Sequence, residues 1–465
     1  MPAPKATVTE AEDAILRSLH PDCPDWEKLG PTTRDSAIRA AAMGQQVAAE
    51  ERESQWSTGF NRRTFLKGGL GIGVAALGAQ LVTSRVSYAA AAEESTGTLV
   101  VIFLRGGMDG LSVLVPRNDA NFSRLRPNVG VRASALIDLN GDARFGLHPA
   151  LAPLKPLIAK RMVAAIPAVS TPDLSRSHFQ AQDCLERGST NSLTSGWLDR
   201  VLEASGAGTT FRSVAVGGMT PRSLMGTSGS IAMSNLDSIA LNGVDDVDAT
   251  AEALRSLYTG IDHPIAQQTT LALGALATVA SIRDAQPSTP ATTYPEGNFA
   301  EALASLAMLI KADAGVRVAC IDVGGWDTHT GMGNVDSGDM KRHLGDLAEA
   351  LAAFTTDIGE TALGRTTIVT MSEFGRRVEE NASGGTDHGH GGAVLVIGGG
   401  VNGGVHGTWN GLTADVLEQG DVPGWNDYRN VLTEVVTKRL DLTTGSIADV
   451  FPNWHAERVG VMAGV

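Results

Sequence analysis

The stretch TTIVTMSEFGRRVEENASGGTDHGHGGAVLVIGGG, residues 366–400, decides the fold because two apolar runs enclose one polar loop. The runs Thr366–Met371 and Ala393–Ile397 are short and rich in β-branched residues, which predicts two buried strands. The glycine-rich loop between them carries two acids and two imidazoles: Glu373, Asp387, His388 and His390. Such groups are costly to bury unless something neutralises them, so a divalent cation, or an anionic substrate held by one, accounts for the cluster. A surface loop with its polar residues in water is the alternative.

Similar apolar runs recur along the chain and extend the prediction to the whole fold. Four more strands are expected at Thr98–Leu104, Met162–Val169, Arg212–Gly217 and Arg317–Val323. Helices are expected at Phe299–Ala312 and Met340–Glu360, where apolar residues recur at three- and four-residue spacing. Buried strands separated by amphipathic helices predict an α/β protein, a three-layer sandwich whose mainly parallel central sheet is flanked by helices.

The overall composition limits the classes of function. A chain of 465 residues with a formal net charge of −14 has room for a large core and no basic stripe, which argues against a nucleic-acid partner. Its three cysteines are Cys23, Cys184 and Cys320, too few for a disulfide framework.

The segment near residue 60 resembles an export signal. NRRTFLK, residues 61–67, is followed by a weakly apolar, glycine-rich stretch and then by small residues up to Ala89. This order predicts a twin-arginine signal peptide over residues 61–89, whereas an ordinary glycine-rich helix is the alternative. Residues 1–60 are then an N-terminal extension, partly disordered or helical, and residues 90–465 form the α/β domain. Export across a bacterial cytoplasmic membrane by the twin-arginine translocase is expected, to the periplasm, the cell envelope or the medium.

Chemically active side chains follow several of the predicted strands. In open α/β sheets, ligands bind beyond the carboxyl ends of the strands, so these side chains are expected to meet at one edge. They are Asp109, Ser175, Ser177, His178, Asp322, Asp327, His329 and Glu373. Asp322, Asp327 and His329, together with the later histidines, predict a metal site, although a lone histidine is usually structural.

Other candidate residues have both a functional and a structural interpretation. Asp109 is either a ligand or a turn residue that bonds its own backbone. Ser175 or Ser177 is either a nucleophile, stabilised by a metal and a helix N-terminus, or a helix N-cap. Arg105 and Arg376 either clamp an anionic group or form surface salt bridges.

Five motifs together carry a family resemblance: RGGMDG, SRSHFQAQD, GGWDTH, SEFGR and GTDHG. They resemble the markers of domain-of-unknown-function family 1501, a twin-arginine-exported bacterial family that is similar to the alkaline phosphatase and sulfatase superfamily. The resemblance implies an alkaline-phosphatase-like fold and one or two divalent metal ions of the zinc, calcium or magnesium class. It implies that Asp109 is the first strand-end acid, that Ser175 or Ser177 is the nucleophile, and that Asp322 and Asp327 form an acid pair.

Two departures from the superfamily pattern affect the expected metal site. Glu373-Phe374-Gly375 stands where the superfamily has Asp-His-Gly, and His329 follows Asp327 by two residues rather than four. His388 or His390 could replace the missing imidazole.

The sequence as a whole predicts an exported metal-dependent hydrolase of phosphate or sulfate esters, with a small anionic ester as substrate. The alternative is a catalytically degenerate binding or scaffold protein with the same fold and a protein partner in the cell envelope.

Overall fold

The computed structural model describes residues 97–464, apart from Gly218, Gly243, Asp245, 261–262 and 286–289. All of them belong to a compact unit that covers Ala75–Val465. The predicted N-terminal extension and signal peptide lie outside the described residues, as does Cys23, so the domain boundaries stay predictions.

The described residues form a large mixed sheet of nine strands, in the order β10-β4-β9-β8-β1-β7-β5-β6, with β11 paired to β4. All neighbours pair in parallel except β9, which is antiparallel to both β4 and β8. The strands are β1 (Thr98–Leu104), β4 (Val163–Ser170), β5 (Ser213–Val216), β6 (Ile231–Met233), β7 (Val318–Val323), β8 (Thr366–Met371), β9 (Gly392–Gly398), β10 (Gly404–Val405) and β11 (Asn426–Asp427). A small antiparallel sheet pairs β2 (Leu114–Pro116) with β3 (Phe145–Leu147).

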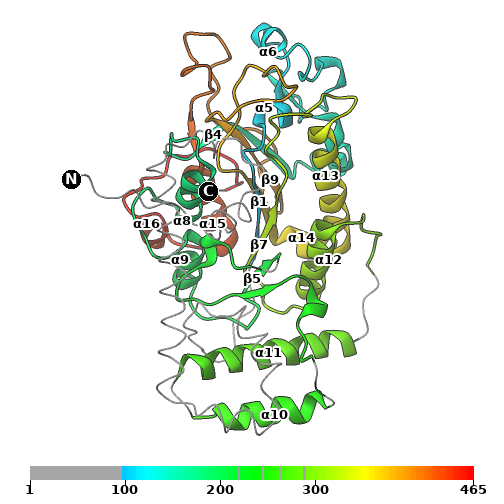
Figure 1. The fold of residues 1–465 in the computed structure, drawn as a ribbon, viewed down its shortest axis with the longest axis vertical. Helices are drawn as coiled ribbons and strands as arrows, with labels where there is room; N and C mark the ends of the chain where they lie inside the picture. The colour runs from blue at the N-terminus through cyan, green and yellow to red at the C-terminus, as the bar shows by residue number, and fades with distance from the viewer. Residues whose placement is uncertain are drawn as a thin grey trace, which may run out of the picture. The chain divides into compact units, whose positions relative to one another are not determined.

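Helices cover both faces of the large sheet (Figure 1). The helices of the described residues are α5 (Gly110–Val113), α6 (Ala120–Leu125), α7 (Lys155–Ala159), α8 (His178–Arg187), α9 (Trp197–Ala204), α10 (Val247–Tyr258), α11 (Pro264–Asp284), α12 (Asn298–Lys311), α13 (Asp339–Asp357), α14 (Gly359–Gly364), α15 (Tyr428–Leu440) and α16 (Thr444–Val450). Of these, α10 and α11 lie apart from the sheet in Figure 1. Short 3₁₀ turns lie at η2 (Ala133–Ala135), η3 (Pro149–Leu154), η4 (Arg222–Leu224) and η5 (Leu236–Ser238).

Two hydrophobic clusters bind these layers together. One joins β1 and β7 to the buried faces of α12 and α13, and the other joins the opposite face of the sheet to α9, α15 and α16. Every residue of β1 is buried, as expected for a central strand covered on both faces. The predicted three-layer α/β architecture with a mainly parallel central sheet is therefore confirmed.

The direction of the strands determines where the predicted site residues gather. β1, β4, β7 and β8 run in the same direction, so their carboxyl ends share one edge of the sheet. Because β9 runs the opposite way, the segment that leads into it, 387–391, begins at this same edge. We call it the carboxyl edge.

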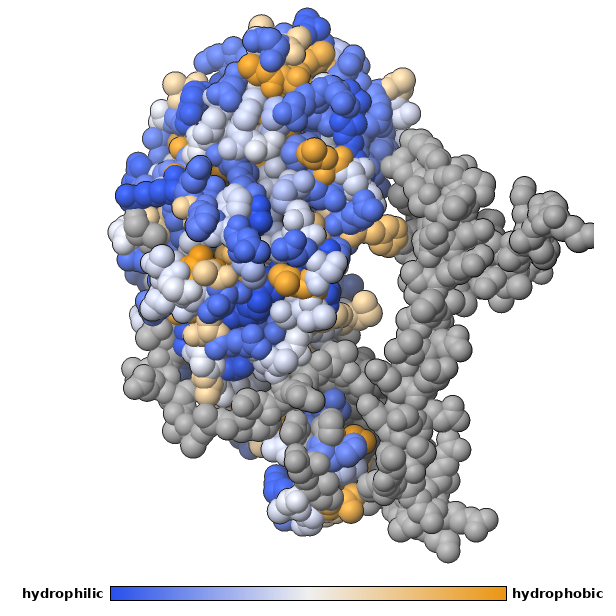
Figure 2. Space-filling model, turned by 90° about the vertical axis from the view of Figure 1, so that its left-hand side faces the viewer, coloured by the Kyte–Doolittle hydropathy of each residue, from blue (hydrophilic) through white to orange (hydrophobic). Residues whose placement is uncertain are grey.

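Hydrophilic residues dominate the face of the molecule that Figure 2 shows, and apolar residues form small separate patches on it. In the described part of the chain, no helix is both long enough and apolar enough to cross a membrane. The last described residues are held by Glu434 of α15, whose carboxylate accepts backbone N–H groups from Val459 to Met462.

Candidate metal centre

Three imidazoles and one carboxylate converge at the carboxyl edge. The Nε2 atoms of His178 and His329 each lie 3.0 Å from Nε2 of His388. Asp327 Oδ1 lies 3.1 Å from Nε2 of His329 and 3.3 Å from Nε2 of His388. Asp327 Oδ2 lies 3.6 Å from Nε2 of His178. We call these four residues the imidazole cluster. His178, Asp327 and His388 offer ligand atoms that all lie within 4.8 Å of one another, and His329 lies beside them.

The outer nitrogen of each imidazole meets a group that can accept a hydrogen bond. His178 Nδ1 lies 2.8 Å from Glu373 Oε1, and His329 Nδ1 lies 3.2 Å from Asp387 Oδ1. His388 Nδ1 lies 3.0 Å from the carbonyl oxygen of Arg176. Carboxylates and carbonyls only accept, so these partners place the proton on Nδ1 and turn the Nε2 lone pairs inward. This is the arrangement in which proteins present histidine to a metal ion.

The spacing of His178, Asp327 and His388 suits a metal ion. With metal–ligand bonds of ~2.0–2.1 Å, the ligand atoms of a tetrahedral ion lie ~3.3 Å apart. Nε2 of His178 lies 3.0 Å from Nε2 of His388, and the Asp327 carboxylate lies 3.6 and 3.3 Å from these two nitrogens, so these distances bracket that value. Imidazole nitrogens together with one carboxylate suit zinc and its transition-metal neighbours, whereas calcium and magnesium take mainly oxygen ligands. Of the three metal classes expected, the donor set fits the zinc class.

The charged groups of the cluster shift each other's pKa values. Burial alone would lower the pKa of His178, but hydrogen bonds and charge from Asp327 and Glu373 raise it to about 9. Burial would likewise raise the pKa of Asp327, yet the three imidazoles and Arg376 hold it well below its usual range. In the metal-free protein a proton on His178 supplies positive charge that an ion would supply instead.

Arg376 fixes the position of Asp327. Its buried guanidinium donates to the carbonyl oxygens of Gly107, at 2.6 Å, and Thr386, at 2.9 Å, and forms an ion pair with Asp327. These bonds tie together the segments that follow β1, β7 and β8. Arg376 thus holds a cluster residue and neutralises its charge, and its role as a clamp for an anionic substrate stays a prediction.

Two glycines bring the His388 segment into place. Gly389 donates to the carbonyl oxygen of Gly375 at 2.9 Å, and Gly375 donates to that of His390 at 2.8 Å. A Cβ added at Gly375 would lie 2.1 Å from the carbonyl oxygen of Gly391, which is too close for any side chain. The close approach of these two segments is what carries His388 to the cluster.

A family described as "Protein of unknown function (DUF1501)" matches residues 163–423, more than half of the chain. The chain belongs to this DUF1501 family. The matched range contains all four residues of the imidazole cluster. A comparison with curated proteins gave no match.

Among solved structures, two similar proteins are hydrolases by name. One is the PsFucS1 sulfatase from Pseudoalteromonas sp., 13% identical over 83% of this chain and 73% of that chain, with a TM-score of 0.32. The other is a mutant TAB5 alkaline phosphatase with Mg bound, 11% identical over 66% of this chain and 92% of that chain, with a TM-score of 0.22. At these TM-scores neither likeness supports a conclusion about this protein.

Asp109 lies away from the cluster and pairs with a residue that sequence reasoning did not consider. Its carboxylate receives two hydrogen bonds from Arg126, at 2.6 and 2.8 Å, and both side chains are fully buried. Burial alone would raise the pKa of Asp109, but the Arg126 guanidinium holds it below its ordinary value. The buried charge of this predicted ligand is therefore already balanced without a metal.

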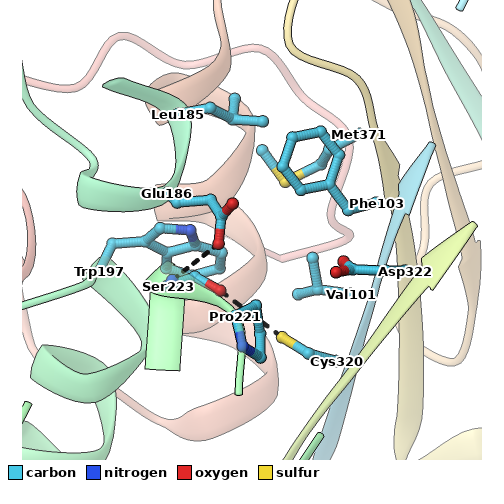
Figure 3. A pocket seen from close by; sticks show the side chains of 10 residues that line it. All are labelled: Val101, Phe103, Leu185, Glu186, Trp197, Pro221, Ser223, Cys320, Asp322 and Met371. Carbon is cyan, nitrogen blue, oxygen red and sulfur yellow. Dashed lines mark hydrogen bonds between the residues drawn. The ribbon is translucent and has the colours of Figure 1, made fainter. Parts of the chain in front are cut away.

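Arg105 and Asp322, predicted as an anion clamp and a ligand, form an ion pair with each other at 2.9 Å. Arg105 also contacts Glu186 at 2.9 Å. Figure 3 shows Glu186 and Asp322 on opposite sides of a small cavity between α8 and the sheet. Both predicted site residues therefore belong to an ionic network beside the imidazole cluster rather than to the cluster.

Three other predicted ligands lie around the cluster without joining it. Glu373 and Asp387 hold the outer nitrogens of His178 and His329. His390 bonds the carbonyl oxygen of Thr171 through Nε2, at 3.1 Å. The two acids therefore orient imidazoles, and His390 faces a different segment.

The two predicted nucleophiles differ in their surroundings. Ser175 is exposed and its hydroxyl donates to Asp173. Ser177 is the N-cap residue of α8, but its side chain makes no capping hydrogen bond. Because it directly precedes His178, Ser177 is the serine whose backbone lies next to the cluster.

Sequence reasoning placed His178 at a strand end but did not include it among the ligands, and it missed Gln182 entirely. Both lie on α8, four residues apart and so on one face of the helix. Gln182 Nε2 donates to Glu373 Oε1 at 2.9 Å. The i, i+4 spacing of an imidazole and an amide just after a buried strand was the available signal.

Proposed function

We propose that this protein is a metal-dependent hydrolase of phosphate or sulfate esters that uses one zinc-class ion. The observation that carries the proposal is the inward orientation of three Nε2 atoms, each fixed by an acceptor on its Nδ1. The Nε2 atom of His388 lies 3.0 Å from the Nε2 atoms of His178 and His329. Without a cation, the lone pairs on such close nitrogen atoms repel each other unless a proton lies between them. Among the described residues, one group of potential ligands lies close enough together to hold an ion, namely His178, Asp327 and His388, which supports one ion rather than two.

The charge balance of the site favours an anionic substrate. The single carboxylate of the cluster is neutralised by Arg376, so the charge of a divalent ion would remain largely uncompensated. α8 begins at His178, which adds the positive end of a ten-residue helix at the same place. A bound ion would act as a Lewis acid that polarises the ester and offsets the negative charge that develops on it.

The chain's own residues have separate roles in this proposal. His178, His388 and Asp327 hold the ion, His329 lies beside them, and Arg376 keeps Asp327 in place. Ser177 is the candidate nucleophile, since it lies at the N-terminus of α8 and its hydroxyl is not engaged in capping. Exposure of about a third of the Asp327 side chain leaves the cluster open to a small substrate.

Measurement of metal content and turnover tests the proposal. The purified protein is expected to bind close to one equivalent of zinc and to hydrolyse an aryl phosphate or an aryl sulfate. His388→Ala should abolish both, whereas His455→Ala, which removes an exposed histidine, should change neither. A wild-type protein that binds no zinc-class metal contradicts the proposal.

A binding or scaffold role is the second candidate, and Phe374 favours it. The Phe374 ring lies 4.9 Å from the His178 ring and 4.8 Å from the His388 ring, so an apolar group packs where the resembled superfamily has an imidazole. One equivalent of metal without turnover of any ester in the panel, and with capture of a specific envelope protein, supports this role.

Export by the twin-arginine translocase belongs to the proposal as well. It rests on the motif NRRTFLK and the small residues that follow it. Replacement of both Arg62 and Arg63 by Lys should retain a reporter fused after residue 95 in the cytoplasm. Unchanged export of that variant contradicts this part of the proposal.

A further inference from the structure

Three polar side chains form a stripe along α8. His178, Gln182 and Glu186 follow one another at four-residue spacing, so they share one face of the helix. Each is linked to the next by a residue that lies just after a strand of the large sheet. Glu373 Oε1 joins His178, at 2.8 Å, to Gln182, at 2.9 Å.

Arg105 makes the second link of the stripe. Its Nη1 donates to Gln182 Oε1 at 3.0 Å and to Glu186 Oε1 at 2.9 Å. A guanidinium has only donors and a carboxylate only acceptors, so the Gln182 amide fits between them in a single orientation. Its oxygen must face Arg105 and its nitrogen must face Glu373.

Arg105 is itself held from several sides. Its Nε pairs with Asp322 at 2.9 Å, and its guanidinium carbon lies 4.0 Å from the centre of the Phe103 ring. Figure 3 shows Phe103, Glu186 and Asp322 gathered around the cavity between α8 and the sheet. The orientation of the Gln182 amide therefore depends on the ionic network of Arg105, Glu186 and Asp322 beside the imidazole cluster.

The carboxylate of Glu373 needs such support. It is fully buried, and its Oε1 receives hydrogen bonds from Gln182, from His178 and from the backbone N–H of Gly106, at 2.9 Å. An acceptor on the outer nitrogen of a metal-bound histidine fixes the ring and strengthens the bond to the metal. The strength of that effect depends on where the acceptor atom is held.

We propose that Gln182 is a positioning residue of the metal centre, which holds Glu373 against His178 and thereby sets the affinity for the ion. This inference rests on the proposed metal site and does not depend on which ester is hydrolysed. Gln182 would act only through Glu373, since its two amide hydrogen bonds go to Arg105 and Glu373.

The test is the affinity for Co²⁺ and Zn²⁺, measured by competition with a chromogenic chelator. Gln182→Met keeps the length of the side chain and its helix propensity but removes both amide groups. A loss of affinity of ~10–100-fold is expected, the usual effect of losing an outer partner of a metal ligand. The matched control is Gln180→Met, an exposed residue of the same helix, which should bind as the wild type does.

A double variant separates positioning from general destabilisation. If Gln182 acts through Glu373, then Gln182→Met should cost little further affinity in a Glu373→Gln background. The visible spectrum of the Co²⁺ protein should change in Gln182→Met and stay unchanged in the control. Arg105→Lys offers a second route should Gln182→Met fail to fold, because one ammonium cannot reproduce the three-way contact of Arg105.

Two results overturn the inference. One is an unchanged Co²⁺ affinity in Gln182→Met, and the other is a full additive loss in the double variant. The proposed function fails separately: a wild type that binds metal tightly but hydrolyses no ester contradicts the activity and leaves this inference standing. A wild type that binds no metal overturns both.

Discussion

Replacement of Asp109 by Asn distinguishes a buried ion pair from a metal ligand. The Asp109 and Arg126 side chains have no exposed surface, and Oδ2 and Nη1 lie 2.6 Å apart. Asn has nearly the same shape and keeps one acceptor oxygen. It also turns an NH₂ group toward the guanidinium and leaves the charge of Arg126 buried without a counterion.

The contacts between Asp109 and Arg126 determine how much stability the substitution removes. Two hydrogen bonds to a charged group contribute about 1.5–3 kcal/mol each. Removal of one partner of a buried ion pair costs about 3–5 kcal/mol. Arg126 keeps its hydrogen bonds to the carbonyl oxygens of Arg377 and Val378, both at 2.7 Å, which limits the loss. We expect Asp109→Asn to lower the free energy of unfolding by about 3–4 kcal/mol at pH 7.

The effect should depend on pH. Arg126 holds the pKa of Asp109 below its ordinary value even though burial alone would raise it. A carboxyl group with a lowered folded-state pKa stabilises the protein above its unfolded pKa of about 3.9, and this contribution is lost as the pH falls through the folded-state value. The difference between wild type and variant should therefore be constant from pH 5 to 7 and shrink below about pH 4.

Urea unfolding followed by tryptophan fluorescence and circular dichroism measures the effect. The control is Asp336→Asn, which removes an exposed pair with Arg132 and should cost less than about 1 kcal/mol. Metal content per folded molecule should stay at the wild-type level in both variants. If Asp109→Asn unfolds at the wild-type urea concentration and has lost its metal, Asp109 is a ligand and the reasoning is refuted.

Three other perturbations have defined outcomes. A zinc concentration 100 times the Kd should raise the free energy of unfolding by about 2.7 kcal/mol, and differential scanning fluorimetry should show no such rise in His388→Ala. Glu434→Gln removes the charge that holds four backbone N–H groups near the C-terminus, so limited proteolysis there should accelerate and stability should fall by about 2 kcal/mol. Gly375→Ala forces Cβ against the carbonyl oxygen of Gly391, so unfolding should become easier by about 1–3 kcal/mol and calorimetry should show weaker zinc binding.

The main layers of the fold could be predicted because burial on both faces leaves a clear pattern. TLVVIFL of β1 and TTIVTM of β8 are apolar or β-branched along their whole length, and each is fully buried. β6, β10 and β11 have only two or three residues and left no such pattern. Strands of that length form because a neighbouring strand offers free hydrogen-bonding groups.

The location of the candidate site could be predicted, but the role of each acidic residue in it could not. Asp327, His329 and His388 follow or precede buried strands, and the carboxyl-edge rule brings them together. The position of an acid at the carboxyl edge does not show whether it forms an ion pair with an arginine. Arg126, which neutralises Asp109, lies 17 residues away in a segment that the strand pattern does not reach. Whether a buried acid is a ligand or an ion-pair partner depends on such long-range contacts.

The origin of the cluster residues in three distant parts of the chain has a consequence for biogenesis. His178 and His388 are 210 positions apart, and Asp327 and His388 are 61 apart. An unfolded polypeptide would have to close both loops before a cation could touch all three segments, and each closure costs conformational entropy. The cation should therefore bind late in folding, after the three segments have come together. Bound cation would then mark molecules that have completed folding.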